Sequence, residues 1–170
     1  MPLNLMERVM FLRSTEVAAG LPDPALRTIA EVAHERSYHA GEVLCREHDL
    51  GTEMFLIVDG SVEVRMHDRP AAEAGGAGAP GTVLAVLGRG DTVGEMSVLD
   101  DQPRSATVAA REPVRVLAVH KEDLRDAIAL CPDVAFGLFR VLSARLRKTS
   151  ATTTLPAAGR PGALRQGSDA

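Results

Sequence analysis

The strongest constraint on the fold lies between residues 41 and 120, where short β-type runs alternate with glycine-containing turns. Along residues 62–66 (VEVRM) apolar and charged side chains alternate, which predicts a strand with one exposed face. Residues 53–58 (EMFLIV) are apolar on both faces and predict a more deeply buried strand. Asp59 and Gly60 between them form a typical hairpin signal. About eight short strands at this spacing predict a mainly β barrel or jelly-roll.

Helical patterns flank the β region on both sides. Apolar residues at helical spacing predict one helix within residues 2–14 and another from about Pro22 to Arg36. After the strands, residues 121–131 predict a helix, and a longer helix follows from Pro132 to about Lys148. On the long helix we expect the apolar face to carry Ala135, Leu138, Phe139, Leu142 and Leu146, opposite Asp133, Gly137, Arg140 and Arg147.

The chain is expected to divide into three parts. Residues 1–36 form the N-terminal helical segment, and residues 37–149 form the β region with its two C-terminal helices. Residues 150–170 show no usable apolar period and predict a disordered tail. Within the β region, residues 67–81 (HDRPAAEAGGAGAPG) contain no large apolar residue and predict a flexible loop.

Composition excludes several classes of protein. The formal net charge of -4 argues against a dedicated nucleic-acid binder, which normally presents a basic face. No apolar run reaches the roughly 18 residues of a membrane span, and Cys45 and Cys131 are too few for a disulfide framework. We therefore expect a cytoplasmic protein with reduced thiols. The five histidines lack metal-ligand spacing and no nucleophile-and-base motif occurs, so neither a metal site nor an enzyme is expected.

The most informative segment is residues 94–108 (GEMSVLDDQPRSATV), where Gly94 and Glu95 precede Arg104 by one short turn and a loop. Arg104 lies among small residues at the start of an apolar strand. With the glycines at 41, 51 and 60 and the helix pair after the last strand, this segment resembles the phosphate-binding cassette of cyclic nucleotide-binding domains. The superfamily includes catabolite activators, protein kinase regulatory subunits and cyclic-nucleotide-gated channels, and the resemblance covers about residues 10–148.

The resemblance implies a β-roll that binds cAMP or cGMP without a further cofactor. Arg104 would bind the exocyclic phosphate oxygens and Glu95 the ribose 2′-hydroxyl, while a short helical turn after Gly94 would aim N–H groups at the phosphate. The ligand-binding residues implied by position are Gly94, Glu95, Met96, Ser97, Arg104, Ser105 and Ala106. Val93 departs from the family pattern, in which an aromatic residue often precedes the Gly-Glu pair. Candidates for a cap over the base are Arg145, Leu146 and Arg147.

Three functions remain open from the sequence. The first is a bacterial-type sensor that binds a cyclic nucleotide and signals through its C-terminal helix to a protein partner or a second copy. The second is a ligand-free structural or dimerisation module, in which Arg104 pairs with Glu95 or Asp101. The third is a transcriptional regulator without its helix-turn-helix, because the residues after Lys148 predict no recognition helix. Ser105 is compatible with either base, and no nucleic-acid binding is expected of the chain alone.

Overall fold

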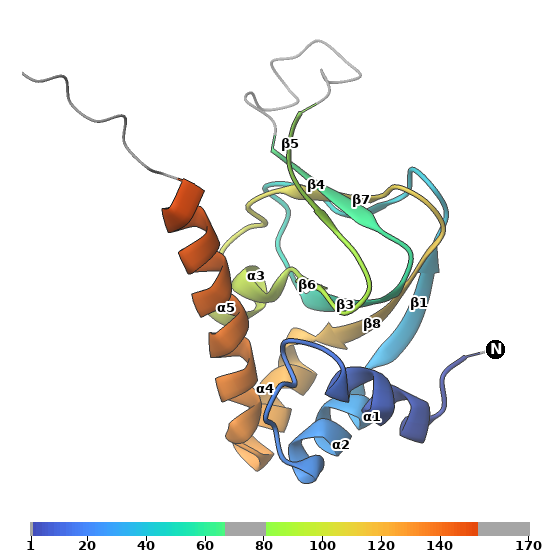
Figure 1. Ribbon diagram of the computed structural model, residues 1–170, viewed down its shortest axis with the longest axis vertical. Helices are drawn as coiled ribbons and strands as arrows, with labels where there is room; N and C mark the ends of the chain where they lie inside the picture. The colour runs from blue at the N-terminus through green and yellow to red at the C-terminus, as the bar shows by residue number, and fades with distance from the viewer. Residues whose placement is uncertain (1, 67–80, 153–170) are drawn as a thin grey trace, which may run out of the picture.

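The computed structural model describes residues 2–66 and 81–152 and arranges eight strands there in two antiparallel sheets (Figure 1). In spatial order, the first sheet contains β1 (His34–Tyr38), β8 (Val114–His120), β3 (Glu53–Asp59) and β6 (Thr92–Val93). The second contains β2 (Val43–Cys45), β7 (Thr107–Ala110), β4 (Val62–Met66) and β5 (Thr82–Leu87). The two sheets face each other around an apolar interior, which confirms the predicted mainly β roll.

Helices cover the outer side of the first sheet and one flank of the roll (Figure 1). They are α1 (Leu5–Arg13), α2 (Asp23–Val32), α3 (Glu95–Asp100), α4 (Lys121–Leu130) and α5 (Asp133–Thr152). The first two helices and α4 pack beside one another, and the long α5 rises from them past α3. The flanking helices, including the C-terminal pair, are therefore confirmed.

The second helix is shorter than predicted. It ends at Val32 instead of near Arg36, because His34–Tyr38 forms strand β1 and pairs with Val114–Ala118 of β8. The division at residue 36 stays a prediction, although β1 begins on its N-terminal side. The predicted disordered tail begins too early, because α5 continues to Thr152 and residues 150–152 are helical. The rest of the tail, residues 153–170, and the predicted loop at residues 67–80 lie outside the described residues.

The predicted hairpin at Asp59 and Gly60 is wrong, because the strands on either side of this turn belong to different sheets. Strand β3 pairs with β8 and β6, whereas β4 pairs with β7 and β5. Gly60 adopts a φ of +81°, and a Cβ atom there would lie 2.4 Å from the carbonyl oxygen of Pro113. Glycine is required here because the crossing chain passes tightly against the turn before β8.

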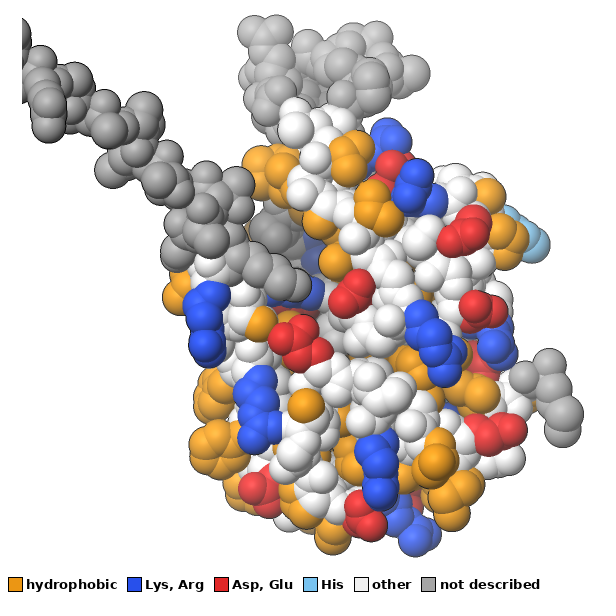
Figure 2. Space-filling model, in the orientation of Figure 1, with side chains coloured by type: hydrophobic (Ala, Val, Ile, Leu, Met, Phe, Trp, Pro, Cys, Tyr) orange, Lys and Arg blue, Asp and Glu red, His pale blue; other side chains and the backbone are white. Residues whose placement is uncertain are grey.

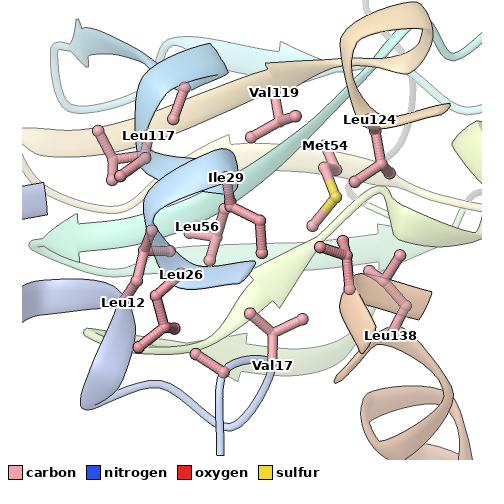
Figure 3. Packing of buried hydrophobic residues seen from close by; sticks show 14 of the residues in the cluster. Leu12, Val17, Leu26, Ile29, Met54, Leu56, Leu117, Val119, Leu124 and Leu138 are labelled. Carbon is pink, nitrogen blue, oxygen red and sulfur yellow. The ribbon is translucent and has the colours of Figure 1, made fainter. Parts of the chain in front are cut away.

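Two apolar clusters stabilise the structure. One lies between the helices and the first sheet and includes Leu12, Leu26, Leu56, Leu117 and Leu138 (Figure 3). The other fills the space between the sheets, with members that include Phe55, Ile57, Val62, Val93 and Val116. Both clusters draw mainly on aliphatic side chains, and the first joins α5 to the roll.

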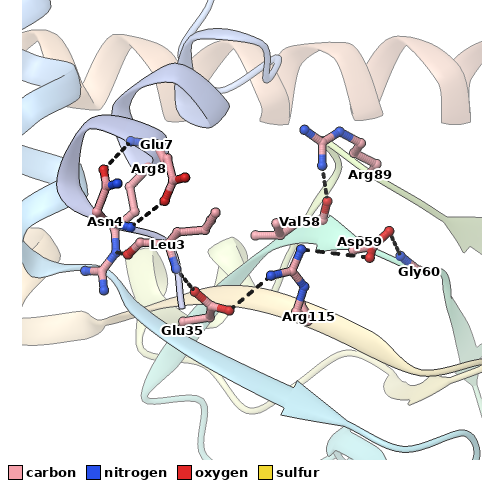
Figure 4. Close-up of polar contacts among 10 residues, drawn as sticks. All are labelled: Leu3, Asn4, Glu7, Arg8, Glu35, Val58, Asp59, Gly60, Arg89 and Arg115. Atoms are coloured by element: carbon pink, nitrogen blue, oxygen red, sulfur yellow. Dashed lines mark hydrogen bonds and ion pairs between the residues drawn. The ribbon is translucent and has the colours of Figure 1, made fainter. Parts of the chain in front are cut away.

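Polar contacts attach the N-terminus to the first sheet (Figure 4). The backbone N–H of Leu3 donates to Glu35 Oε2 at 2.6 Å, and Glu35 Oε1 accepts from Arg115 at 3.4 Å. Asn4 and Glu7 form a capping box that satisfies free N–H groups at the start of α1. The N-terminal helix is thus fixed at both its cap and the preceding residue.

The buried face of α5 differs from the predicted one. Phe139 and Leu146 were expected in the core but are 56% and 69% exposed, whereas Leu138 is buried as expected. Gly137, expected on the polar side, is buried, and a Cβ atom there would lie 2.0 Å from the carbonyl oxygen of Val17. The inward face of α5 thus carries Val134, Leu138 and Val141, and Gly137 lets this face approach the backbone at Val17.

We expect Gly137→Ala to destabilise the protein by about 1 to 3 kcal/mol, because the added methyl group overlaps the Val17 carbonyl. Helix propensity alone predicts the opposite sign, a gain of about 1 kcal/mol. Urea unfolding measures the difference, with Ser143→Ala on the exposed side of α5 as the control that should change little. A stabilised Gly137→Ala variant would show that the two backbones are not in close contact.

Candidate functional site

The segment singled out in the sequence forms one compact substructure. Strand β6 ends at Val93, Gly94 turns the chain with a φ of +81°, and the short helix α3 begins at Glu95. A Cβ atom on Gly94 would lie 2.2 Å from Nη1 of Arg104, so a larger residue cannot coexist with this arginine position. The helical turn predicted after Gly94 is confirmed, and Val93 packs in the cluster between the sheets.

Arg104 is buried and held by neutral oxygen atoms. Its Nη1 donates to the carbonyl oxygen of Gly94 at 2.9 Å and to Oγ of Ser97 at 3.0 Å, and its Nη2 donates to the carbonyl oxygen of Glu53. Only 6% of the residue is exposed. On the remaining side, a Cβ on Gly51 would lie 2.8 Å from Nε. These partners orient the guanidinium without neutralising its charge, which suits an anion-binding group.

Glu95 is the second buried ionisable residue of this region, with an exposed fraction of 0%. Its Oε1 accepts a hydrogen bond from Arg145 of α5, and Arg145 also donates to the carbonyl oxygen of Thr92. Oε2 is buried and has no hydrogen-bond partner in the part of the chain that the structure describes. Burial raises the pKa of Glu95, while the neighbouring Arg145 charge acts in the opposite direction.

The ion pair considered for a ligand-free cassette is not the one observed. Arg104 donates to carbonyl and hydroxyl oxygens, whereas Glu95 pairs with Arg145. Asp101 pairs with Lys121 and with Arg125 of α4. The pair of Arg104 with Glu95 or Asp101, which belonged to the ligand-free alternative, is therefore not found among the described residues.

All seven ligand-binding residues predicted from the sequence border one cavity of about 70 Å³, which has room for a few water molecules. They are Gly94, Glu95, Met96, Ser97, Arg104, Ser105 and Ala106. The rest of its lining comes from Cys45, Val64, Leu87, Val93, Val108 and Arg145. The side chains from β2, β4, β5 and β7 were missed, although every second residue of a strand faces the interior and such positions could have indicated them.

The three residues predicted as candidates for a cap over the base do not lie at the same place. Arg145 lines the cavity, whereas Leu146 and Arg147 are exposed, and Arg147 borders a groove on another side of α5. Within the described ranges, no cluster of three or more potential metal ligands occurs. No helix there combines the length and apolarity that crossing a bilayer requires.

The family model and the similar proteins all point to the same family. The model of the cyclic nucleotide-binding domain matches residues 35–130. A cyclic nucleotide-gated potassium channel of Rhizobium etli is 31% identical over an alignment of 136 positions, which covers 76% of this chain and 34% of the channel. The cyclic AMP receptor protein of Thermus thermophilus is 36% identical over 114 residues, which are 66% of this chain and 49% of that protein. The chain thus spans about a third to a half of these relatives.

Solved structures agree with the sequence comparison. The catabolite activator protein of Thermus thermophilus superposes with a TM-score of 0.70 at 30% identity, over 81% of this chain and 61% of that chain. The N-terminal domain of a transcriptional regulator from Streptomyces coelicolor superposes with a TM-score of 0.65, also at 30% identity. That match covers 86% of this chain and 95% of the solved domain.

Burial of Glu95 predicts a specific pH dependence. Because its pKa is raised in the folded state, the free energy of unfolding should fall as pH rises from the ordinary carboxyl range towards neutrality. The variant Glu95→Gln has no carboxyl group at this position, so its free energy of unfolding should not show this decrease. The difference in melting temperature, variant minus wild type, should therefore increase from about pH 4 to pH 7. Thermal unfolding followed by circular dichroism measures this difference, with exposed Glu122→Gln as the control. A difference independent of pH would contradict the raised pKa.

Proposed function

The chain belongs to the cyclic nucleotide-binding domain family, and we propose that it is a sensor module for cAMP or cGMP. The observation that carries this proposal is that a buried guanidinium and a buried carboxyl group border the same cavity. Arg104 has only neutral partners at its Nη atoms, and Glu95 Oε2 has none among the described residues. Leaving a buried polar atom unsatisfied is costly, and a ligand hydroxyl at Oε2 would remove that cost.

The side chains of Arg104 and Glu95 fit two different groups of a cyclic nucleotide. The single negative charge of the cyclic phosphate would lie against Arg104, and the ribose 2′-hydroxyl would donate to Oε2 of Glu95. The apolar side chains of Val64 and Leu87 would then lie on the side of the base. This assignment makes the site a binding site and not a catalytic one, since its residues supply charge and shape but no nucleophile.

Binding requires the cavity to widen. Its present volume of about 70 Å³ is too small for a nucleotide, and Arg145 reaches into it from α5. A nucleotide entering beside Glu95 would displace or redirect Arg145, so occupancy would change how α5 contacts the cassette. We therefore propose that α5 changes its position or order when a nucleotide binds. Arg145 would then be the residue that covers the bound ligand.

The output surface that we propose is the outer side of α5. Phe136 and Phe139 are 60% and 56% exposed, and with Arg140 and Arg147 they border a groove. Figure 2 shows hydrophobic and basic side chains together along the side of the molecule that α5 forms. Phe136 and Phe139 are three residues apart, and Leu146 follows Phe139 by one heptad, with Ser143 at the position between them. This is the repeat of a two-helix seam, so a second copy of this chain fits the surface.

The alternatives differ from this proposal in measurable ways. A ligand-free module of the same fold would keep the α5 surface but show no response to nucleotide. A regulator lacking its DNA-binding part would need a basic surface or a partner, and the net charge of -4 favours weak DNA binding at most. We also propose a cytoplasmic location, which we expect because Cys45 and Cys131 are free thiols.

Cyclic nucleotide should raise the melting temperature of the wild-type protein, because the ligand binds the folded state. At 100 times the dissociation constant the stabilisation is about 2.7 kcal/mol, or roughly 5 to 10 °C for a chain of this size. Arg104→Lys keeps the charge but loses the forked geometry, so it should lose at least about tenfold in affinity. Each protein is compared with its own ligand-free form, since Arg104 is buried and its replacement also affects stability.

The matched control for this experiment is Arg27→Lys, which changes an exposed arginine on α2. It should respond to nucleotide as the wild type does. If millimolar cAMP and cGMP both leave the wild-type melting temperature unchanged, the ligand-free module becomes the better account. If Arg104→Lys responds like wild type, the nucleotide binds elsewhere.

The proposed dimer gives a second test. Replacing both Phe136 and Phe139 by serine should convert a dimer to a monomer in sedimentation equilibrium, because the apolar seam would be lost. Leu130→Ser is the control, since Leu130 is 80% exposed but does not border the groove. A wild-type protein that remains monomeric at all concentrations would exclude a homodimer through α5.

A further inference from the structure

An ion-pair bridge joins the far end of the cassette helix to α4. Asp101 ends α3, and its two carboxylate oxygens pair with separate cations on α4. Oδ1 contacts Nζ of Lys121, and Oδ2 accepts from Arg125 at 2.8 Å. Asp101 holds this position with a φ of +61°, a conformation that only a small fraction of non-glycine residues adopt. The hydrogen bond from Lys121, and then that from Arg125, lower the pKa of Asp101.

A second contact ties the same turn of α4 to the partners of Arg104. The backbone N–H of Lys121 donates to the carbonyl oxygen of Thr52 at 2.8 Å. The next carbonyl oxygen along the chain, that of Glu53, accepts from the guanidinium of Arg104. Any ligand that draws Arg104 towards itself therefore acts on a peptide segment already bonded to the start of α4.

Beyond its first turn, α4 is packed against the helix proposed to carry the output. Leu124 and Ala127 of α4 are buried, and Leu124 shares an apolar cluster with Val134 and Leu138 of α5 (Figure 3). Closely packed side chains transmit a displacement because no space remains to absorb it. A movement of the α4 N-terminus thus reaches α5 through packed side chains.

We propose that Asp101 is a positioning residue that couples the state of the cassette to α4 and through it to α5. This inference rests on the proposed function for the identity of the signal, and it adds a route separate from the direct contact between Arg145 and Glu95. An exposed ion pair contributes little to stability alone, and the Asp101 side chain is 53% exposed. Its role is to fix the relative position of two elements, so coupling is the quantity to measure.

Two variants separate the charge from the backbone conformation. Asp101→Asn removes the charge and keeps a residue that tolerates positive φ, whereas Asp101→Gly removes the charge and relieves the backbone. Asp126→Asn is the control, because it removes a carboxylate from an exposed position on α4, the helix that carries the two cations bound by Asp101. If coupling depends on the ion pairs, both Asp101 variants should behave alike and unlike the control.

The readout is amide hydrogen exchange across residues 133–147, measured with and without saturating cAMP or cGMP so that changes in affinity do not interfere. Wild type and Asp126→Asn should gain protection there of about fivefold or more on binding. In both Asp101 variants this gain should fall by more than half, while calorimetry still detects the bound nucleotide. An undiminished gain in Asp101→Asn would overturn the proposal.

A second experiment without ligand tests the ion pairs of Asp101 even if the wild type binds no cyclic nucleotide. Arg104→Lys then serves as the perturbation of the cassette, and exchange is followed across residues 121–130 of α4. This variant should change exchange in α4 in the wild-type and Asp126→Asn backgrounds, and by less than half as much together with Asp101→Asn, where only the backbone contact between Lys121 and Thr52 remains. Equal changes in every background would refute the coupling role of Asp101, whereas missing nucleotide binding alone refutes only the proposed function.

Discussion

The site depends on the way Arg104 is buried. A guanidinium removed from water must keep its N–H groups bonded, and here Gly94, Glu53 and Ser97 supply the acceptors. These acceptors are neutral, so the positive charge stays available to an incoming anion. The arrangement also explains Gly94 and Gly51, because a side chain on Gly94 would occupy the space of Arg104, and one on Gly51 would overlap Ser97 and Arg104. The turn between β6 and α3 thereby holds the guanidinium of Arg104 in one orientation.

The carboxylate beside it links this local arrangement to the rest of the molecule. Glu95 is fully buried, and its observed ionic partner, Arg145, comes from α5. The position of α5 is in turn fixed by the close approach at Gly137 and by the apolar cluster that contains Leu138. The ion pair between Glu95 and Arg145 therefore joins the cassette to α5, in addition to the apolar cluster that packs the helices against the first sheet. A ligand that competes for Glu95 acts at the junction between them.

Sequence reasoning succeeded where the information is local. The turn at Gly94 and the alternating strands follow from neighbours in the chain, and both form as expected. The cassette residues were assigned from the family resemblance; they border one cavity, and their role in binding stays a prediction. Sequence reasoning failed where distant segments decide the outcome. The turn at Gly60 separates two sheets because β3 and β4 find other partners, and residues 34–38 form a strand because β8 is beside them. The carbonyl partners of Arg104 carry no side-chain signature, so no pattern could reveal them.

The central claim is that one cavity holds a cyclic phosphate on Arg104 and a ribose 2′-hydroxyl on Glu95. Isothermal titration of the wild-type chain with cAMP, cGMP and their 2′-deoxy analogues tests both halves directly. The account predicts saturable binding of at least one ribonucleotide and about tenfold or more weaker binding of its 2′-deoxy analogue, since the analogue leaves Oε2 of Glu95 unpaired. Equal affinity for the ribose and deoxyribose forms, or no binding of any of the four, would contradict it.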